Sequence, residues 1–185
     1  MCPIPVINIE TSTGDAKRAM ENAQQAYGFV PNLTAVMANA PLLAEAYQTL
    51  GGLFEKTSFS SDEKQVIYLA ISAENGCDYC MAAHSVIADM NQLAAEVTEA
   101  IRRGQPIDDP RLEALRSFTQ HLVSERGWIG DDVRAAFLAA GYSETQILEV
   151  VLGVGMKTLS NYTNHIAGTP LDQAFAHRVW TKPDA

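Results

Sequence analysis

The chain of 185 residues has few cysteines, few basic residues and no long apolar run, and each shortage excludes a class of protein. Three cysteines are too few, and odd in number, for a disulfide-stapled scaffold. Thirteen basic against 22 acidic residues leave a net charge of −9, which argues against a protein that coats nucleic acid or binds an anionic membrane. No apolar run approaches the ~20 residues that span a bilayer, and the first residues lack the basic and apolar regions of a signal peptide. We therefore expect a cytoplasmic protein with no nucleic-acid partner and no membrane partner.

What is present is a globular composition, with 47% hydrophobic and 19% charged residues. Apolar residues seldom alternate in short runs between turns, so strands are not expected and the predicted fold class is all-α. Prolines and Ser-x-x-Glu/Gln capping boxes at Ser60 and Ser143 mark helix starts. We predict one domain over 1–185, with an extended segment at 1–12 and a loop at 28–32. The predicted helices cover 15–27, 41–56, 61–75, 78–90, 93–103, 110–126, 131–140, 143–167 and a last stretch from 169 toward 180.

An internal repeat is indicated by identities at one fixed offset. Three pairs of identical residues lie 81 positions apart (for example 165 − 84): Glu63 and Glu144, Gln65 and Gln146, His84 and His165. The apolar positions between them also align, so helices around 61–90 and 143–167 are interpreted as a duplicated core; the alternative is chance alignment of two buried helices. The chemistry is not duplicated, because Thr158 and Asn161 stand where the first copy has cysteines.

The candidate chemistry lies in Cys77, Cys80 and His84. Residues three and four apart share a helix face, so these side chains form one stripe. Gly76 predicts that Cys77 starts the helix, where unpaired N–H groups and the helix dipole favour a thiolate. His84 can take a proton from Cys80 or, when charged, stabilise its thiolate, and Cys77 can close a disulfide on oxidised Cys80. This is the equipment of a thiol peroxidase or a dithiol–disulfide oxidoreductase.

Three other interpretations of the same residues stay open. The cysteines could be buried structural thiols, since cysteine is among the most buried residue types. They could form part of a zinc site with His84, but no second Cys/His pair supplies a fourth ligand at a finger-like spacing. They could belong to a thioredoxin-like fold, which requires a strand before the motif, whereas the preceding segment is predicted to be helical.

The segment Asn75-Gly76-Cys77-x-Tyr79-Cys80-x-x-Ala83-His84 resembles the alkylhydroperoxidase D family, in its peroxidase-related branch, within the carboxymuconolactone decarboxylase superfamily. The resemblance implies a helical fold with an internally repeated core, and homo-oligomers such as trimers or hexamers. It implies that Cys80 attacks the hydroperoxide, that Cys77 is the resolving thiol and that His84 belongs to a proton relay. It also implies that no cofactor is bound and that the reductant is a dithiol on a lipoyl-bearing partner protein.

One departure from the family pattern concerns the proton relay. The family has a glutamate twelve residues before the first cysteine, and this chain has Gln65 there, an amide that cannot accept and return a proton at neutral pH. Glu74 is the best substitute, and Glu63 is second, although its position in a capping box favours a structural role. Tyr79 replaces a histidine found in some members.

We therefore predict a thiol-dependent peroxidase or disulfide oxidoreductase with Cys77, Cys80, His84 and Glu74 as catalytic residues. Two alternatives remain: an enzyme of the carboxymuconolactone decarboxylase type, which does not need paired cysteines, and a low-activity stress-related binding module.

Overall fold

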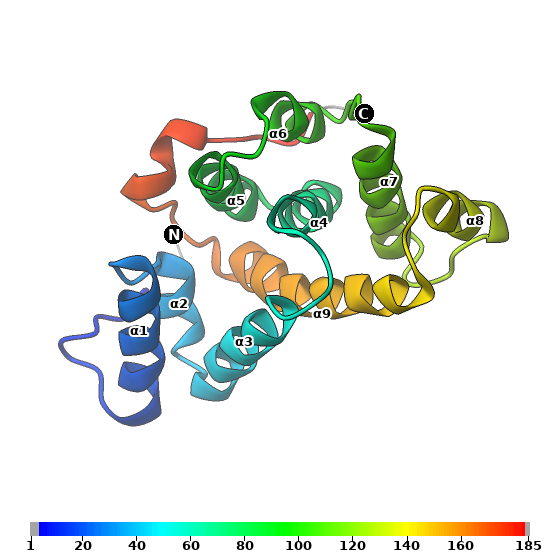
Figure 1. The fold of residues 1–185 in the computed structure, drawn as a ribbon. Helices are drawn as coiled ribbons and strands as arrows, with labels where there is room; N and C mark the ends of the chain where they lie inside the picture. The colour runs from blue at the N-terminus through cyan, green and yellow to red at the C-terminus, as the bar shows by residue number, and fades with distance from the viewer. Residues whose placement is uncertain (1–3, 184–185) are drawn as a thin grey trace.

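The computed structural model describes residues 4–183, and all regular structure within them is helical (Figure 1), which confirms the predicted all-α class. No helix in this part of the chain is long and apolar enough to cross a membrane. The helices in residues 4–183 are α1 Gly14–Tyr27, α2 Asn32–Met37, α3 Pro41–Phe54, α4 Ser61–Glu74, α5 Asp78–Met90, α6 Ala95–Arg102, α7 Pro110–Ser124, α8 Asp131–Ala139, α9 Glu144–Ala167 and the 3-10 helix η1 Gln173–Arg178.

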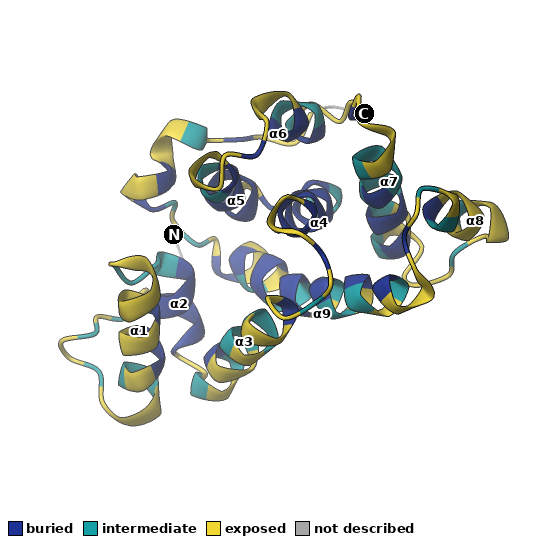
Figure 2. Cartoon of the chain, in the orientation of Figure 1, coloured by how far each residue is buried: buried dark blue, intermediate teal, exposed yellow. Residues whose placement is uncertain are grey.

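Helix α4 is the centre of the core. All its residues from 63 to 73 are buried, and α5, α6, α7 and α9 pack around it, as Figure 2 shows by its dark colour in the middle of the molecule. The predicted capping box starts it: the Glu63 N–H donates to Ser60 Oγ, and Glu63 Oε2 accepts the Ser60 N–H. Since apolar side chains surround the helix on nearly every side, burial rather than amphipathicity stabilises it.

The turn between α4 and α5 is a Schellman motif. Gly76 adopts a left-handed φ of 66°, its N–H donates to the Ala73 carbonyl at 3.1 Å, and the Cys77 N–H donates to the Ser72 carbonyl at 2.9 Å. Cys77 then serves as the N-cap of α5. A glycine is favoured at position 76 because a Cβ is strained at this φ. The sequence Asn75-Gly76-Cys77 therefore ends one buried helix and begins the next within three residues.

Helix α9 lies across α2, α3, α4, α5 and α7. It begins with the second predicted capping box, in which Ser143 Oγ accepts the Gln146 N–H. At Gly153 it approaches its neighbours so closely that a Cβ would lie 2.8 Å from Phe54 Cε2 and 3.2 Å from Ile67 Cγ2. The absence of a side chain at Gly153 thus lets α9 press against α3 and α4.

The two halves of the predicted repeat differ in register and in continuity. Their N-caps, Ser60 and Ser143, are 143 minus 60, or 83, positions apart, two more than the offset of the sequence identities. The first half breaks between α4 and α5, whereas α9 continues without interruption. His84 is buried, while His165, its counterpart in the sequence repeat, is exposed.

Two predictions about helices need correction. Residues 32–37 form α2 although a loop was expected up to 32, because Asp172, distant in sequence, accepts the first N–H of this helix, that of Asn32. The segment from 169 to 180 contains the 3-10 helix η1 at Gln173–Arg178 rather than an α-helix. Arg102 binds the carbonyls of Arg178 and Val179 and draws the chain away from a helical path.

The N-terminal segment is not extended throughout. Asn8 starts a turn, because its carbonyl accepts the Thr11 N–H and the Ser12 hydroxyl. The rest of the expected extended segment, residues 1–3 with Cys2, lies outside the described residues.

Candidate active site

The two cysteines lie where α5 begins. Cys77 is its N-cap and Cys80 lies in its first turn, where backbone N–H groups have no helical acceptor. Both are free thiols and both are buried, with exposed fractions of 0% for Cys77 and 2% for Cys80. The cysteines, Tyr79, Ala82 and Ala83 form an apolar cluster with residues of α1, α2 and α3. The predicted start of the helix at the cysteine pair is thus present.

A polar stripe of α9 faces the cysteine pair. It consists of four buried residues at helical spacing: Lys157, Ser160, Asn161 and Asn164. Asn164 Nδ2 lies 3.3 Å from Cys80 Sγ and 3.7 Å from Cys77 Sγ, so one amide touches both sulfur atoms. Ser160 Oγ lies 3.8 Å from Cys80 Sγ. The sulfur atoms are therefore supplied by α5 and their polar environment by α9.

This environment gives the two thiols different acidities. Burial raises the pKa of Cys80, but a hydrogen bond from the Cys77 thiol, the charge of Lys157 and the polar groups of Ser160 and Asn161 outweigh it and lower the pKa to about 5. The hydrogen bond to Cys80, together with burial, raises the pKa of Cys77. Cys80 is thus the thiolate at neutral pH, and Cys77 remains a protonated thiol that donates to it.

Lys157 is the cation of this site. Its side chain is fully buried, and its ammonium has no hydrogen-bond partner in residues 4–183. It lies over the ring of Tyr68, with Nζ 5.7 Å from the ring centroid, and the ring of Tyr68 lies 4.6 Å from that of His84. The site therefore contains one buried positive charge beside one acidic thiol.

His84 is buried one turn after Cys80 and faces α4. Its Nδ1 lies 3.4 Å from Gln65 Oε1, so the amide at the expected relay position does contact the predicted base. Burial, followed by the charge of Lys157, holds the pKa of His84 well below its usual value of 6.5. His84 is neutral at pH 7, and the positive charge beside Cys80 comes from Lys157 instead of an imidazolium.

The two glutamates considered for the relay occupy different environments. Glu74 is the last residue of α4 and is half-exposed; its carbonyl accepts from Lys182 Nζ at 2.9 Å, and its carboxylate makes no hydrogen bond or ion pair in residues 4–183. Glu63 completes the capping box of α4 and pairs with Arg111 at 3.1 Å. These contacts support the structural interpretation of Glu63.

Tyr79, which replaces a histidine of some family members, is tied to other segments. Its hydroxyl donates to Asp172 Oδ2 and accepts the Leu33 N–H. Tyr79 therefore fastens the start of α5 to α2 and to the segment before η1, and its hydroxyl is not directed to the cysteines.

A hollow of about 420 Å³ lies beside the start of α5. Asn164 and Gly76 line it together with His165 and residues 180–182. Neither cysteine lines this hollow, but Asn164, which does, also touches both sulfur atoms.

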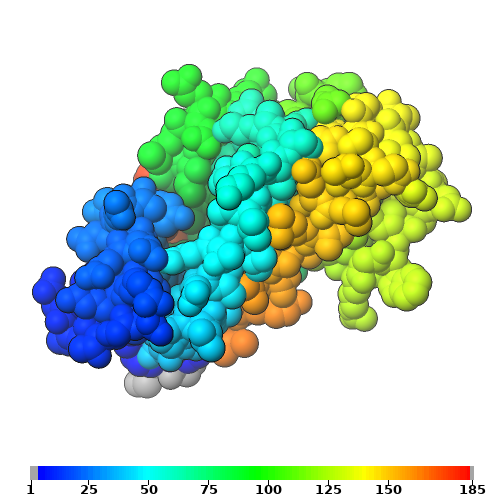
Figure 3. Space-filling model, turned by 60° about the horizontal axis from the view of Figure 1, so that its bottom comes forward, coloured from blue at the N-terminus to red at the C-terminus, as the bar shows by residue number. Residues whose placement is uncertain are grey.

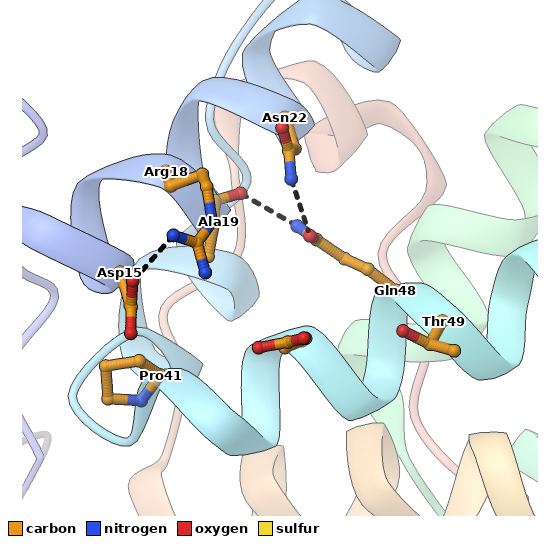
Figure 4. Close-up of a pocket in the computed structure, with 8 residues that line it drawn as sticks. Asp15, Arg18, Ala19, Asn22, Pro41, Gln48 and Thr49 are labelled. Atoms are coloured by element: carbon orange, nitrogen blue, oxygen red, sulfur yellow. Dashed lines mark hydrogen bonds and ion pairs between the residues drawn. The ribbon is translucent and has the colours of Figure 1, made fainter.

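A second hollow, of about 350 Å³, lies between α1 and α3 (Figure 4). Its polar side chains are bound within the hollow: Arg18 pairs with Asp15 at 2.7 Å, and Gln48 donates to the backbone carbonyl of Ala19. It is lined by no cysteine or histidine. In the described part of the chain, no group of three or more His, Cys, Asp or Glu side chains could hold a metal ion.

The sequence interpretation identified the residues on α5 but missed those on α9. The sequence does contain a signal for the α9 residues, because polar residues at 157, 160, 161 and 164 interrupt one face of an otherwise apolar helix. Alignment of the repeats had drawn attention to Asn161 only as the residue opposite Cys80.

Comparison with known proteins agrees with this fold. Residues 41–120, which include the cysteine motif, match the family model of the carboxymuconolactone decarboxylase family. No curated protein matches the chain.

Solved structures extend the likeness to almost the whole chain. An alkylhydroperoxidase AhpD core, peroxidase-related protein from Ralstonia eutropha JMP134 is 23% identical with a TM-score of 0.82, covering 94% of this chain and 95% of that one. A peroxidase-related protein from Silicibacter sp. TM1040 is 17% identical with a TM-score of 0.78, covering 94% and 92%. The debrominase Bmp8 is 18% identical with a TM-score of 0.78, covering 95% of each chain. The family match over residues 41–120 and the shared helical fold agree with the resemblance to alkylhydroperoxidase D-like proteins of the carboxymuconolactone decarboxylase superfamily.

Proposed function

We propose that the protein is a thiol-dependent peroxidase that cycles between the Cys77–Cys80 dithiol and its disulfide. The observation that carries this proposal is the contact between an acidic Cys80 and a protonated Cys77 at the start of one helix, with donors of α9 around the sulfur atoms. Structural thiols need no such difference in acidity. The peroxidase-related neighbours share the fold and are consistent with this assignment.

In the first step, the Cys80 thiolate attacks the terminal oxygen of a hydroperoxide. An S–O bond forms, the O–O bond breaks, and the departing alkoxide takes up a proton to leave as an alcohol. Asn164 and Ser160 lie close enough to orient the reacting sulfur. Cys80 is left as a sulfenic acid.

In the second step, Cys77 attacks the Cys80 sulfur, the disulfide forms and water leaves. The Cys77 thiol must lose its proton, and we assign His84, neutral and therefore able to accept a proton, to this transfer. Gln65 can hold the imidazole through its contact with Nδ1 but cannot take the proton onward. Glu74 remains a candidate for the proton's exit from the site.

The cycle is completed when a dithiol reductant returns the pair to the thiol state. A dihydrolipoyl group on a partner protein fits this role, since it delivers two electrons and closes its own disulfide. We propose the hollow at the start of α5 as the approach of such a small dithiol, because Asn164 lines it and touches both sulfur atoms. The proposed cycle uses no cofactor.

We also propose that the protein assembles as a homo-oligomer, with a trimer or hexamer expected. Helices α3 and α9 lie side by side on the face shown in Figure 3. These two helices expose large apolar side chains that a second copy could cover: Leu42, Leu53, Leu148, Val151, Tyr162 and Ile166. Light scattering should give a multiple of 20.1 kDa, and a monomer at micromolar concentration would contradict the assembly.

The experiment that tests the function counts free thiols before and after one equivalent of hydroperoxide. A Cys2→Ser background leaves only the paired cysteines. We expect both thiols to disappear together and to return with dihydrolipoate. Cys80→Ser in the same background is the matched control, and it should keep its one thiol.

Retention of both thiols would contradict the peroxidase. An enzyme of the decarboxylase type or a low-activity binding module would then explain the fold better. One structural neighbour is a debrominase. Incubation of the Cys2→Ser protein and its Cys80→Ser control with a brominated pyrrole therefore shows whether the thiolate attacks a halogen instead.

A further inference from the structure

Lys157 is costly to bury, and the structure gives it no ordinary compensation. Its side chain is fully buried, and no hydrogen bond or carboxylate reaches its ammonium in residues 4–183. The ring of Tyr68 offsets part of that cost. A buried cation normally requires an opposite charge close by. Among residues 4–183, the acidic group on which the charge of Lys157 acts is the Cys77–Cys80 pair, which faces the same stripe of α9.

We propose that the Lys157 ammonium is the buried counter-charge of the Cys80 thiolate, and that it thereby stabilises the dithiol state of the cysteine pair over its disulfide. This inference rests on the proposed redox role of the pair. It makes Lys157 a positioning residue that sets the reduction potential of the Cys77–Cys80 pair. The fold alone does not determine this potential.

The argument follows from charge in the two redox states. In the reduced state the site holds one ammonium and one thiolate, and these compensate each other. When the disulfide forms, the thiolate charge disappears and Lys157 is left buried without a partner. Since only the reduced state is stabilised, the disulfide becomes a stronger oxidant and is reduced by weaker thiols.

Other groups that face Cys80 or Lys157 do not supply this charge. Beside Cys80 these groups are the protonated Cys77, Tyr79 and Tyr47, and beside Lys157 they are Tyr68 and His84. Burial raises the pKa of each tyrosine and lowers that of His84, so all of these groups are neutral near pH 7.

The test equilibrates the protein with mixtures of reduced and oxidised glutathione at pH 7, in the Cys2→Ser background. In the reaction, two glutathione thiols become one glutathione disulfide and two electrons pass to the pair. The S–S bond breaks, Cys77 ends as a thiol and Cys80 as a thiolate, and one proton is released. Trapping with a thiol reagent and mass spectrometry gives the reduced fraction.

Lys157→Met should shift this equilibrium at least about tenfold toward the disulfide, which corresponds to a reduction potential about 30 mV lower. Lys157→Arg, which keeps the charge, should stay closer to the parent, and Lys157→Gln repeats the test with a polar neutral side chain. Lys64→Met is the matched control, because Lys64 is also buried but pairs with Glu55. Its equilibrium should stay within about twofold of the parent, as expected for an independent site.

A second readout separates electrostatics from packing. The thiolate absorbance of Cys80 should titrate at higher pH in Lys157→Met and Lys157→Gln than in Lys157→Arg. Equal glutathione equilibria for the parent and both neutral variants would overturn the inference, while leaving the peroxide reaction intact. Failure of peroxide to oxidise the pair would instead contradict the proposed function. A measured difference in reduction potential between the parent and the neutral Lys157 variants would still support the role of Lys157.

Discussion

The α4–α5 segment and α9, which the sequence predicts to be the two halves of a repeat, contribute different chemistry to one site. The first half is broken at Gly76, and this break makes Cys77 the N-cap of a new helix. The second half runs unbroken and presents a buried lysine with a serine and two asparagines. A helix interior has no free N–H groups to offer a thiolate, so the break places the nucleophile and the continuous helix supplies its polar partners.

This comparison shows why neither half would be reactive alone. Without α9, Cys80 would keep the helix terminus but lose Lys157, Ser160 and Asn164, and burial would raise its pKa. Without the break, the cysteines would lie within a helix and lose the terminus.

Substitution of the two cysteines should separate their roles most completely. Cys80→Ser should abolish hydroperoxide consumption, because the acidic thiol is removed. Cys77→Ser should allow a single turnover and leave a sulfenic acid on Cys80, detected as a mass increase of one oxygen. A dead Cys77→Ser beside a reactive Cys80→Ser would invert the assignment.

Restoring an acid at the relay position should raise activity. Gln65 already contacts His84, so Gln65→Glu would place a carboxylate against the imidazole and let it pass a proton. General-base help contributes ~10²–10⁴-fold at good geometry. Repulsion of the thiolate costs about 1 kcal/mol, or about fivefold to tenfold. We expect a net gain of about tenfold or more in turnover with a lipoyl-type reductant.

Glu74→Gln tests the proposed exit of the proton through Glu74, whose carboxylate makes no hydrogen bond or ion pair in residues 4–183. If Glu74 carries the proton out, turnover of this variant should fall by about tenfold or more. Turnover within about twofold of the parent would remove Glu74 from the relay.

The helix break should be more sensitive to substitution than the continuous helix. Gly76→Ala places a Cβ at a φ of 66° and should destabilise the fold by about 1–2 kcal/mol. Gly155→Ala, within α9 and with no atom within 4 Å of its added Cβ, should be neutral or stabilise by up to about 1 kcal/mol. Urea unfolding of both variants measures the difference. Equal changes in the free energy of unfolding would show that the backbone conformation at Gly76 does not constrain the helix break.

The buried histidine should make the fold sensitive to acid. Because the pKa of His84 is lowered in the folded state, the unfolded chain binds a proton more readily below pH 6.5, and stability is lost as the pH falls from there. Between pH 6.5 and 5.5 the parent should lose about 1 kcal/mol more than His84→Gln. The exposed His165 provides the control, because His165→Gln should lose as much stability as the parent over this pH range.

The sequence predicted the local features of this molecule well and its long-range ones poorly. Both capping boxes, the helix start at Cys77 and the all-α class follow from residues close together in the chain. By contrast, α2 and η1 depend on Asp172 and Arg102, which act across more than 70 positions. Lys157 was missed for the same reason: only the packing of α9 against α5 places its charge beside Cys80.

The measurement that tests this account most directly is a pH titration of the thiolate absorbance at Cys80. It is made on the reduced Cys2→Ser chain, with Cys80→Ser as the blank. The account predicts a thiolate that forms with a pKa of about 5, well below the usual value near 9, because α9 supplies charge and donors to a helix terminus. A titration near 9 would contradict it, since Cys80 would then be an ordinary buried thiol and the two halves of the repeat would share no chemistry.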